Sequence, residues 1–166
     1  DQIIKTGSPM LEVINKNEKN ISKSNVLNEL NLKKNDYFLV SAHREENVDD
    51  ENSLNELLST LIFISKKFKK KVIFSTHPRT QKLIKKLNRK DFKKTIVFLN
   101  PFGFSDYIKL QINAYCVISD SGTITEEASI LNFPAITIRR MHERPEGMDR
   151  GVLIMSGLDQ NNVAKS

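Results

Sequence analysis

The fold is decided by residues 116–128, which read CVISDSGTITEEA. The first residues of this stretch are apolar without polar alternation, which predicts a short strand that is buried on both faces. A turn of small polar residues follows, from Asp120 to Thr123, and a helix is expected from Ile124 to Leu131. A strand, a tight turn and a helix in direct succession indicate one unit of an α/β sheet.

The same unit recurs on both sides of this stretch. Strands are expected at residues 37–40, 72–75, 95–99, 116–119 and 134–138, with a late sixth at 152–155. Helical periodicity predicts helices between them, at 51–68, 80–87 and 106–114. This alternation predicts an α/β fold of the Rossmann-like kind, a parallel sheet with helices on both faces. Ligands of such sheets bind beyond the carboxyl ends of the strands, so the residues that follow the strands are the candidates.

Composition narrows the classes of function. The chain has 166 residues and a mass of 19.0 kDa, with 39% hydrophobic and 28% charged residues, as in a globular domain. The net charge of +6 raises the possibility of a nucleic-acid partner. However, the lysines gather at the ends of predicted helices, at 66–71 and 82–94, and aromatic residues make up only 7%. We therefore expect solvated helical faces and no nucleic acid.

The single cysteine, the three histidines and the ends of the chain indicate which bonds, metal sites and compartment to expect. Cys116 is the single cysteine and lies in an apolar run, so we expect a buried thiol, no disulfide and no cysteine-rich metal site. The three histidines are scattered without ligand spacing, and we expect no metal and no cofactor. Apolar runs are short and no leader is recognisable, which predicts a cytoplasmic protein without a membrane partner. The absent initiating Met leads us to expect a piece of a longer chain.

The turn after the strand at 116–119 is the most specific candidate site. Backbone N–H groups at a helix start favour an anion, and Gly122 allows it to approach the backbone closely. Ser121 and Thr123 add hydroxyl donors, and Glu127 lies one turn further on, where it can accept from sugar hydroxyls. An ordinary helix cap made by Ser121, with acidic residues in the first turn, explains the pattern equally well.

Three more polar clusters follow predicted strands. They are HREEN at 43–47, HPR at 77–79 and RRMHERPE at 139–146. Histidine beside arginine and carboxylates suits proton transfer or diphosphate binding, although a capped, solvated loop has the same composition. The cluster at 77–79 also fits a strand terminator with a basic flank. Because the carboxyl ends of parallel strands share one edge, the clusters together predict an anionic ligand, a phosphate ester.

These clusters resemble the non-hydrolysing UDP-N-acetylglucosamine 2-epimerase family. The matching stretches are 41–47, 100–107, 119–128 and 143–146, and the likeness extends over roughly residues 1–160. The resemblance implies a GT-B enzyme, in which two Rossmann-like halves face each other across a cleft. Residues 1–166 would be the carboxy-terminal UDP-binding domain, without the amino-terminal domain. The full-length protein would be a homodimer that binds a UDP-sugar.

The resemblance also implies a role for individual residues. Ser121, Gly122 and Thr123 would hold the UDP diphosphate, and Glu127 would bind the ribose hydroxyls. Arg144 would lie within the nucleotide site, and the segment around Phe102 and Tyr107 would line the uracil pocket. His43 would be a catalytic residue near the diphosphate and the sugar. Arg44 and His77 match positions that contact an allosteric UDP-sugar in bacterial members.

The implied reaction interconverts UDP-GlcNAc and UDP-ManNAc by elimination and re-addition of UDP, through a 2-acetamidoglucal intermediate. The family's acid–base carboxylates lie in the amino-terminal half, so we expect this chain alone to bind nucleotide weakly and to be inactive. Thr123 stands where the commonest pattern has a second glycine. The stretches 41–49 and 141–149 look more like a subgroup that forms UDP-N-acetyl-L-fucosamine. Two competing hypotheses are a GT-B glycosyltransferase donor domain, which shares the fold, and a non-catalytic nucleotide-sugar sensor.

Overall fold

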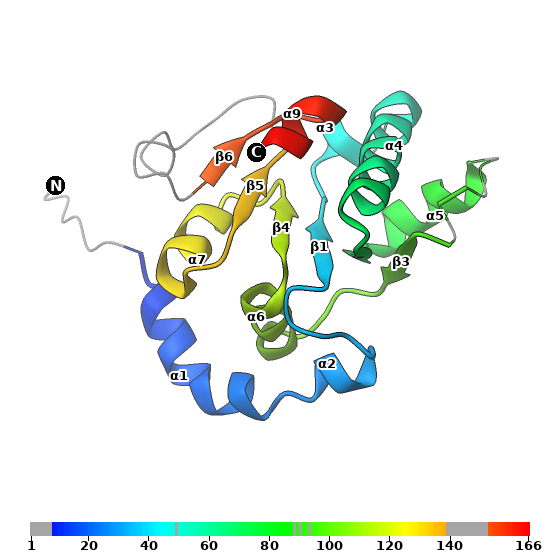
Figure 1. Ribbon diagram of the computed structural model, residues 1–166. Helices are drawn as coiled ribbons and strands as arrows, with labels where there is room; N and C mark the ends of the chain where they lie inside the picture. The colour runs from blue at the N-terminus through cyan, green and yellow to red at the C-terminus, as the bar shows by residue number, and fades with distance from the viewer. Residues whose placement is uncertain (1–7, 49, 88, 90, 93, 139–152) are drawn as a thin grey trace, which may run out of the picture.

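A six-stranded parallel sheet forms the centre of the molecule (Figure 1). The computed structural model describes residues 8–48, 50–87, 89, 91–92, 94–138 and 153–166. The strand order is β3-β2-β1-β4-β5-β6. The strands are β1 (Tyr37–Ser41), β2 (Lys71–Ser75), β3 (Ile96–Leu99), β4 (Cys116–Ser119), β5 (Ala135–Thr137) and β6 (Leu153–Met155). The predicted parallel α/β fold is confirmed, including the sixth strand.

The central strands are apolar throughout because both of their faces are covered. All five residues of β1 are buried, and β1 pairs with β2 on one side and with β4 on the other. Tyr37 is fully buried, and its hydroxyl donates to the carbonyl oxygen of Leu110 at 2.6 Å. Burial raises the pKa of the Tyr37 phenol, so it stays a neutral donor.

Helices cover the two faces of the sheet (Figure 1). The helices of the described residues are α1 (Met10–Lys23), α2 (Val26–Glu29), α3 (Glu45–Val48), α4 (Glu51–Phe68), α5 (Pro78–Lys86), α6 (Phe104–Asn113), α7 (Ile124–Leu131) and α9 (Gln160–Lys165), of which α1 packs on α6 and α7. The α4 helix presents a leucine-rich stripe to one face, where α5 and α9 join it, and α6 and α7 pack on the other. Each fully buried Leu or Ile stabilises this arrangement by about 1.5–3 kcal/mol.

Local signals set the ends of the helices. The Asp50 carboxylate accepts from the backbone N–H of Ser53 at 2.9 Å and so begins α4, which ends at Lys69 in the left-handed conformation. The His77 ring accepts from the backbone N–H of Arg79 at 3.3 Å, and Pro78 occupies the first turn of α5. That helix therefore begins two residues before the predicted start at 80.

The order of the strands reverses between β1 and β4. From β1 the chain continues outward to β2 and β3, whereas β4, β5 and β6 follow on the opposite side. In a doubly wound sheet the loops beyond these two strands diverge and leave a crevice for a ligand. The turns after Ser41 and Ser119 therefore hold the candidate site.

Candidate functional site

The Asp120 carboxylate is the centre of a polar network at the point where the strand order reverses. Its side chain follows β4 and is only 1% exposed. It accepts from the backbone N–H of His43 at 3.0 and 3.1 Å and from that of Arg44 at 2.9 Å. The Asn47 amide donates to the same carboxylate at 3.0 Å. These donors compensate the buried charge and tie the turn after β1 to the turn after β4.

This arrangement decides where an external anion can bind. The backbone N–H groups of His43 and Arg44 precede α3, and the Asp120 carboxylate already uses them. The Arg44 Nε also donates, at 3.1 Å, to the backbone oxygen of Asp120. These three donors are therefore already used, whereas the start of α7 is a helix N-terminus at this edge where an anion can bind.

The start of α7 is a ladder of hydroxyl groups. The Ser119 hydroxyl accepts from the backbone N–H of Ser121 at 3.1 Å, and the Ser121 and Thr123 hydroxyls lie 2.9 Å apart. Thr123, and not Ser121, is the N-cap residue, and its hydroxyl donates to Glu127 Oε1 at 2.8 Å instead of capping the helix. Gly122, half-buried, lies in the turn between them. Hydroxyl donors and the first-turn N–H groups thus surround one small region.

The Glu127 carboxylate is held at both of its oxygens. It is 8% exposed, and Thr123 donates to Oε1. The Gln111 amide of α6 donates to Oε2 at 2.6 Å. Since each carboxylate oxygen can accept more than one hydrogen bond, Glu127 keeps acceptor capacity for a further hydroxyl group.

His43 lies at the open rim of this network, and Tyr107 lies within it. The His43 side chain is exposed, and its Nε2 lies 2.6 Å from the Ser41 hydroxyl. Burial raises the pKa of Tyr107 to about 12, although its side-chain hydrogen bonds with Ser41 and Gln111 lower that pKa. Tyr107 is therefore a neutral phenol at ordinary pH, and His43 is the more accessible group for proton transfer.

The structure does not place every predicted residue in this network. Phe102 is half-buried and packs against the apolar cluster beneath α6. His77 is exposed after β2 and makes the local contact that caps α5. Arg144, with the whole cluster at 139–146, lies outside the described residues.

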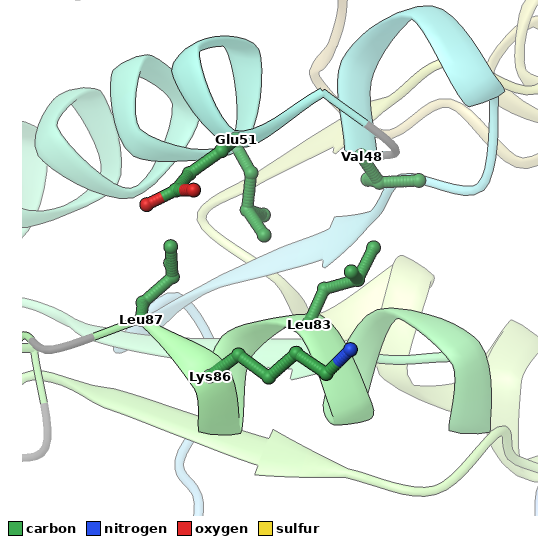
Figure 2. A pocket seen from close by; sticks show the side chains of 6 residues that line it. Val48, Glu51, Leu83, Lys86 and Leu87 are labelled. Carbon is green, nitrogen blue, oxygen red and sulfur yellow. The ribbon is translucent and has the colours of Figure 1, made fainter.

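Two hollows lie away from the network. One, of about 200 Å³, is lined by Val48, Glu51, Leu54, Leu83, Lys86 and Leu87, between α3–α4 and α5. Figure 2 shows Glu51 and Lys86 on its opposite sides. The other, of about 380 Å³, lies near α9 and includes Phe38, Phe68 and Val163. The described residues contain no cluster of three metal-ligating side chains. Within the same residues, no helix is long and apolar enough to cross a bilayer.

Four residues of the network had no individual role in the sequence-based prediction, although two of them, Asn47 and Asp120, lie in predicted polar clusters. The four are Ser41, Asn47, Gln111 and Asp120. For Asp120 the signal is its place directly after a strand, before Ser121 and Gly122. For Gln111 the signal is weaker: it lies four residues after Tyr107 and seven after Phe104, on a helix face where apolar residues are usual.

A doubly wound parallel sheet with hydroxyl groups at a helix start beside the strand reversal defines a Rossmann-like α/β domain. The family model described as "UDP-N-acetylglucosamine 2-epimerase" matches residues 1–166. This chain therefore belongs to the UDP-N-acetylglucosamine 2-epimerase family.

Solved structures and curated sequences of 2-epimerases are similar to this chain. A UDP-N-acetylglucosamine 2-epimerase structure from Rickettsia bellii is 50% identical with a TM-score of 0.86, over 96% of this chain and 42% of that one. The Methanocaldococcus jannaschii enzyme "in complex with UDP-GlcNAc and UDP" is 35% identical with a TM-score of 0.86, over 98% and 46%. A Methanococcus maripaludis UDP-N-acetylglucosamine 2-epimerase is 39% identical over 130 residues, 76% of this chain and 36% of its own length. The chain spans less than half the length of these relatives.

The same fold occurs in another class of enzyme. An E. coli heptosyltransferase structure covers 80% of this chain with a TM-score of 0.54 at 14% identity. At that identity the likeness shows the fold alone.

Proposed function

We propose that this chain is the carboxy-terminal, UDP-binding half of a UDP-sugar 2-epimerase of two Rossmann-like domains. The observation that carries the proposal is the start of α7, where Ser121, Thr123 and Glu127 form one hydrogen-bonded group beside the strand reversal. The Asp120 carboxylate already accepts from the backbone N–H groups of His43 and Arg44, so those two donors do not compete with the start of α7 for an anion. Family membership and the relative crystallised with UDP-GlcNAc and UDP support the same assignment.

In this proposal different residues bind the diphosphate, the ribose and the uracil of UDP. Ser121, Gly122 and Thr123 bind the diphosphate, and Glu127 accepts from the ribose hydroxyls. The segment from Phe102 to Tyr107 lines the uracil pocket. The proposal also assigns Arg144 to the nucleotide site and Arg44 with His77 to a second, allosteric UDP-sugar. The two-domain protein forms a homodimer, which light scattering checks.

The reaction that we propose removes the C2 proton of the sugar while the bond between C1 and UDP breaks. This leaves a 2-acetamidoglucal and free UDP in the closed site. UDP then adds back at C1 as a proton arrives on the opposite face of C2. Negative charge grows on the departing diphosphate, and the backbone N–H groups in the first turn of α7 point toward it and stabilise it. His43, at the rim, is the catalytic residue that this chain contributes, and the base comes from the other half.

The test is proton exchange at C2. The two-domain protein is incubated in deuterated water with UDP-GlcNAc and, separately, with UDP-2-acetamido-2,6-dideoxy-L-talose, and NMR reads deuterium at C2. Incorporation with UDP-GlcNAc supports the ordinary 2-epimerase, and incorporation only with the talose compound supports the fucosamine-forming reaction. Exchange with neither compound overturns the proposal. Sugar transfer to an acceptor would then identify a glycosyltransferase, and UDP-sugar binding without chemistry would identify a sensor.

A further inference from the structure

Gln111 is a fully buried polar residue that lies beside the proposed nucleotide site without facing the nucleotide. Its side chain, on α6, is 0% exposed, and its Nε2 donates to Glu127 Oε2 at 2.6 Å. Its own Oε1 is buried and receives no hydrogen bond from the residues that the structure describes, so the interaction of Gln111 with Tyr107 does not satisfy this oxygen. An unpartnered buried oxygen is unfavourable, so packing alone would favour an apolar residue of this size.

The Glu127 carboxylate explains why an amide stands at this position. Turning the amide over would bring two oxygen atoms together, so the carboxylate fixes which end of Gln111 faces it. In return, Gln111 and Thr123 fix one carboxylate oxygen each, at 2.6 and 2.8 Å. A planar group held at both oxygens cannot rotate, and its remaining lone pairs keep a single direction.

We propose that Gln111 is a positioning residue for nucleotide binding: with Thr123 it holds Glu127 in the orientation that accepts from the ribose hydroxyls. This inference rests on the proposed UDP site, and it adds that affinity for the nucleotide depends on a residue that does not touch it. Preorganisation of this kind improves binding because the ligand does not have to order the acceptor.

The charged and titratable groups around Gln111 determine how the binding affinity of a Gln111 variant depends on pH. Tyr107 on α6 interacts electrostatically with both Glu127 and Asp120, and the Tyr107 phenol is neutral at ordinary pH because its pKa is raised to about 12. Glu126, the neighbouring residue on α7, accepts from the Ser8 hydroxyl at 2.6 Å. A second carboxyl group opposite Glu127 would therefore meet negative charge from Glu127 and Asp120. Two facing carboxyl groups share one proton until the pH lies well above the usual carboxyl range.

The experiment compares Gln111→Glu with Gln111→Met, by UDP titration of the two-domain protein at pH 8 and pH 5.5. Affinities are expressed relative to wild type at the same pH, which removes the titration of UDP itself. At pH 8 the new carboxyl group repels Glu127, and we expect Gln111→Glu to bind UDP at least about tenfold more weakly. At pH 5.5 the shared proton restores a donor, and affinity returns to within about threefold of wild type. Gln111→Met, without a donor, is about tenfold weaker at both pH values.

Gln160→Glu is the matched control, since it introduces the same charge on α9, on the opposite face of the sheet. It should bind UDP as wild type does at both pH values. Wild-type affinity in both Gln111 variants at both pH values overturns the inference and leaves the proposed function standing. Failure of the wild-type two-domain protein to bind UDP overturns the proposed function, and the inference with it. Amide spectra of each variant verify the fold, and Gln111→Met, close in size, provides the decisive comparison if Gln111→Glu does not fold.

Discussion

The turn after β1 and the turn after β2 look alike in sequence and differ in structure. Both follow a buried strand, and both contain a histidine next to a polar or basic residue. After β1, the backbone of His43 is tied to Asp120, 77 residues further along the chain. After β2, His77 makes a contact only two residues away, with the backbone of Arg79. The His43 backbone is therefore held by a distant residue, whereas the His77 ring makes the local contact of a helix cap, although Thr76 beside it donates to Leu99 of β3 at 3.0 Å.

The difference comes from the position of each strand in the sheet. β1 lies beside β4, where the strand order reverses, so its turn meets a second turn across the crevice. β2 lies between β1 and the edge strand β3, and its turn leads directly into α5. At the strand reversal, the end of β4 lies opposite the turn after β1 and supplies the Asp120 carboxylate that binds the His43 backbone.

The largest effect is expected from breaking the network at its centre. Asp120→Ala leaves the donors of His43, Arg44 and Asn47 without their acceptor, in a place that is almost closed to water. We expect the free energy of unfolding to fall by about 3 kcal/mol. Urea unfolding measures the change, with the exposed Asp36→Ala as the matched control, expected within about 0.5 kcal/mol of wild type. Equal losses in the two variants would contradict the central place of Asp120.

The second prediction separates the two ends of the nucleotide. Ser121→Ala removes a hydroxyl proposed to serve the diphosphate, so it should weaken UDP binding about tenfold and leave uridine binding unchanged. Glu127→Gln should weaken both ligands, because the ribose is common to them. Calorimetric titration measures all four affinities, and Ser129→Ala, exposed on α7, is the control. If Ser121→Ala weakened uridine as strongly as UDP, the assignment to the diphosphate would be wrong.

A smaller effect is expected at the turn after β2. His77→Ala removes the side chain that accepts from Arg79, and we expect a loss of about 1 kcal/mol in the free energy of unfolding. His77→Asn should recover most of that loss, since asparagine is a good N-cap residue. A loss as large as that of Asp120→Ala in the same urea experiment would remove the contrast between the two turns.

The smallest effect concerns the buried thiol in β4. Burial raises the pKa of Cys116 from 9.0 to about 12. Below pH 9 the thiol is neutral in both folded and unfolded chains, and it contributes no pH dependence. Between pH 9 and 12 only the unfolded chain ionises, so stability falls as the pH rises, by up to about 1 kcal/mol per pH unit. Thermal unfolding at pH 8 and 10 should show a smaller decline in Cys116→Ala than in wild type; parallel declines would contradict the burial of an un-ionised thiol.

Local patterns predicted most of the fold. The helix at 51–68 has the predicted bounds, and the strand at 116–119 is where its apolar residues indicated. Both predictions rest on the spacing of apolar residues that are close together in the sequence. The buried Cys116 was predicted for the same reason, because its apolar neighbours already indicate a covered strand.

The site was predictable only in part. The small residues 121–123 carry their own signal, since a turn and a helix start are local features. The partners of Asp120 lie 73 to 77 residues away, and only the pairing of β1 with β4 brings them together. The hydrogen bond between Gln111 and Glu127 could not be predicted from the sequence. A single amide on an apolar helix face does not indicate its partner, and the two residues meet only when α6 and α7 pack together.

The most direct test of the UDP site is a titration of the isotopically labelled chain with UDP, followed through its backbone amide signals. A site at the start of α7 predicts shifts concentrated at residues 119–127 and at the adjoining turn, 41–47, with much smaller changes at the lysine-rich segment 66–71. Shifts centred on 66–71, or no change at 119–127 with saturating UDP, would contradict it.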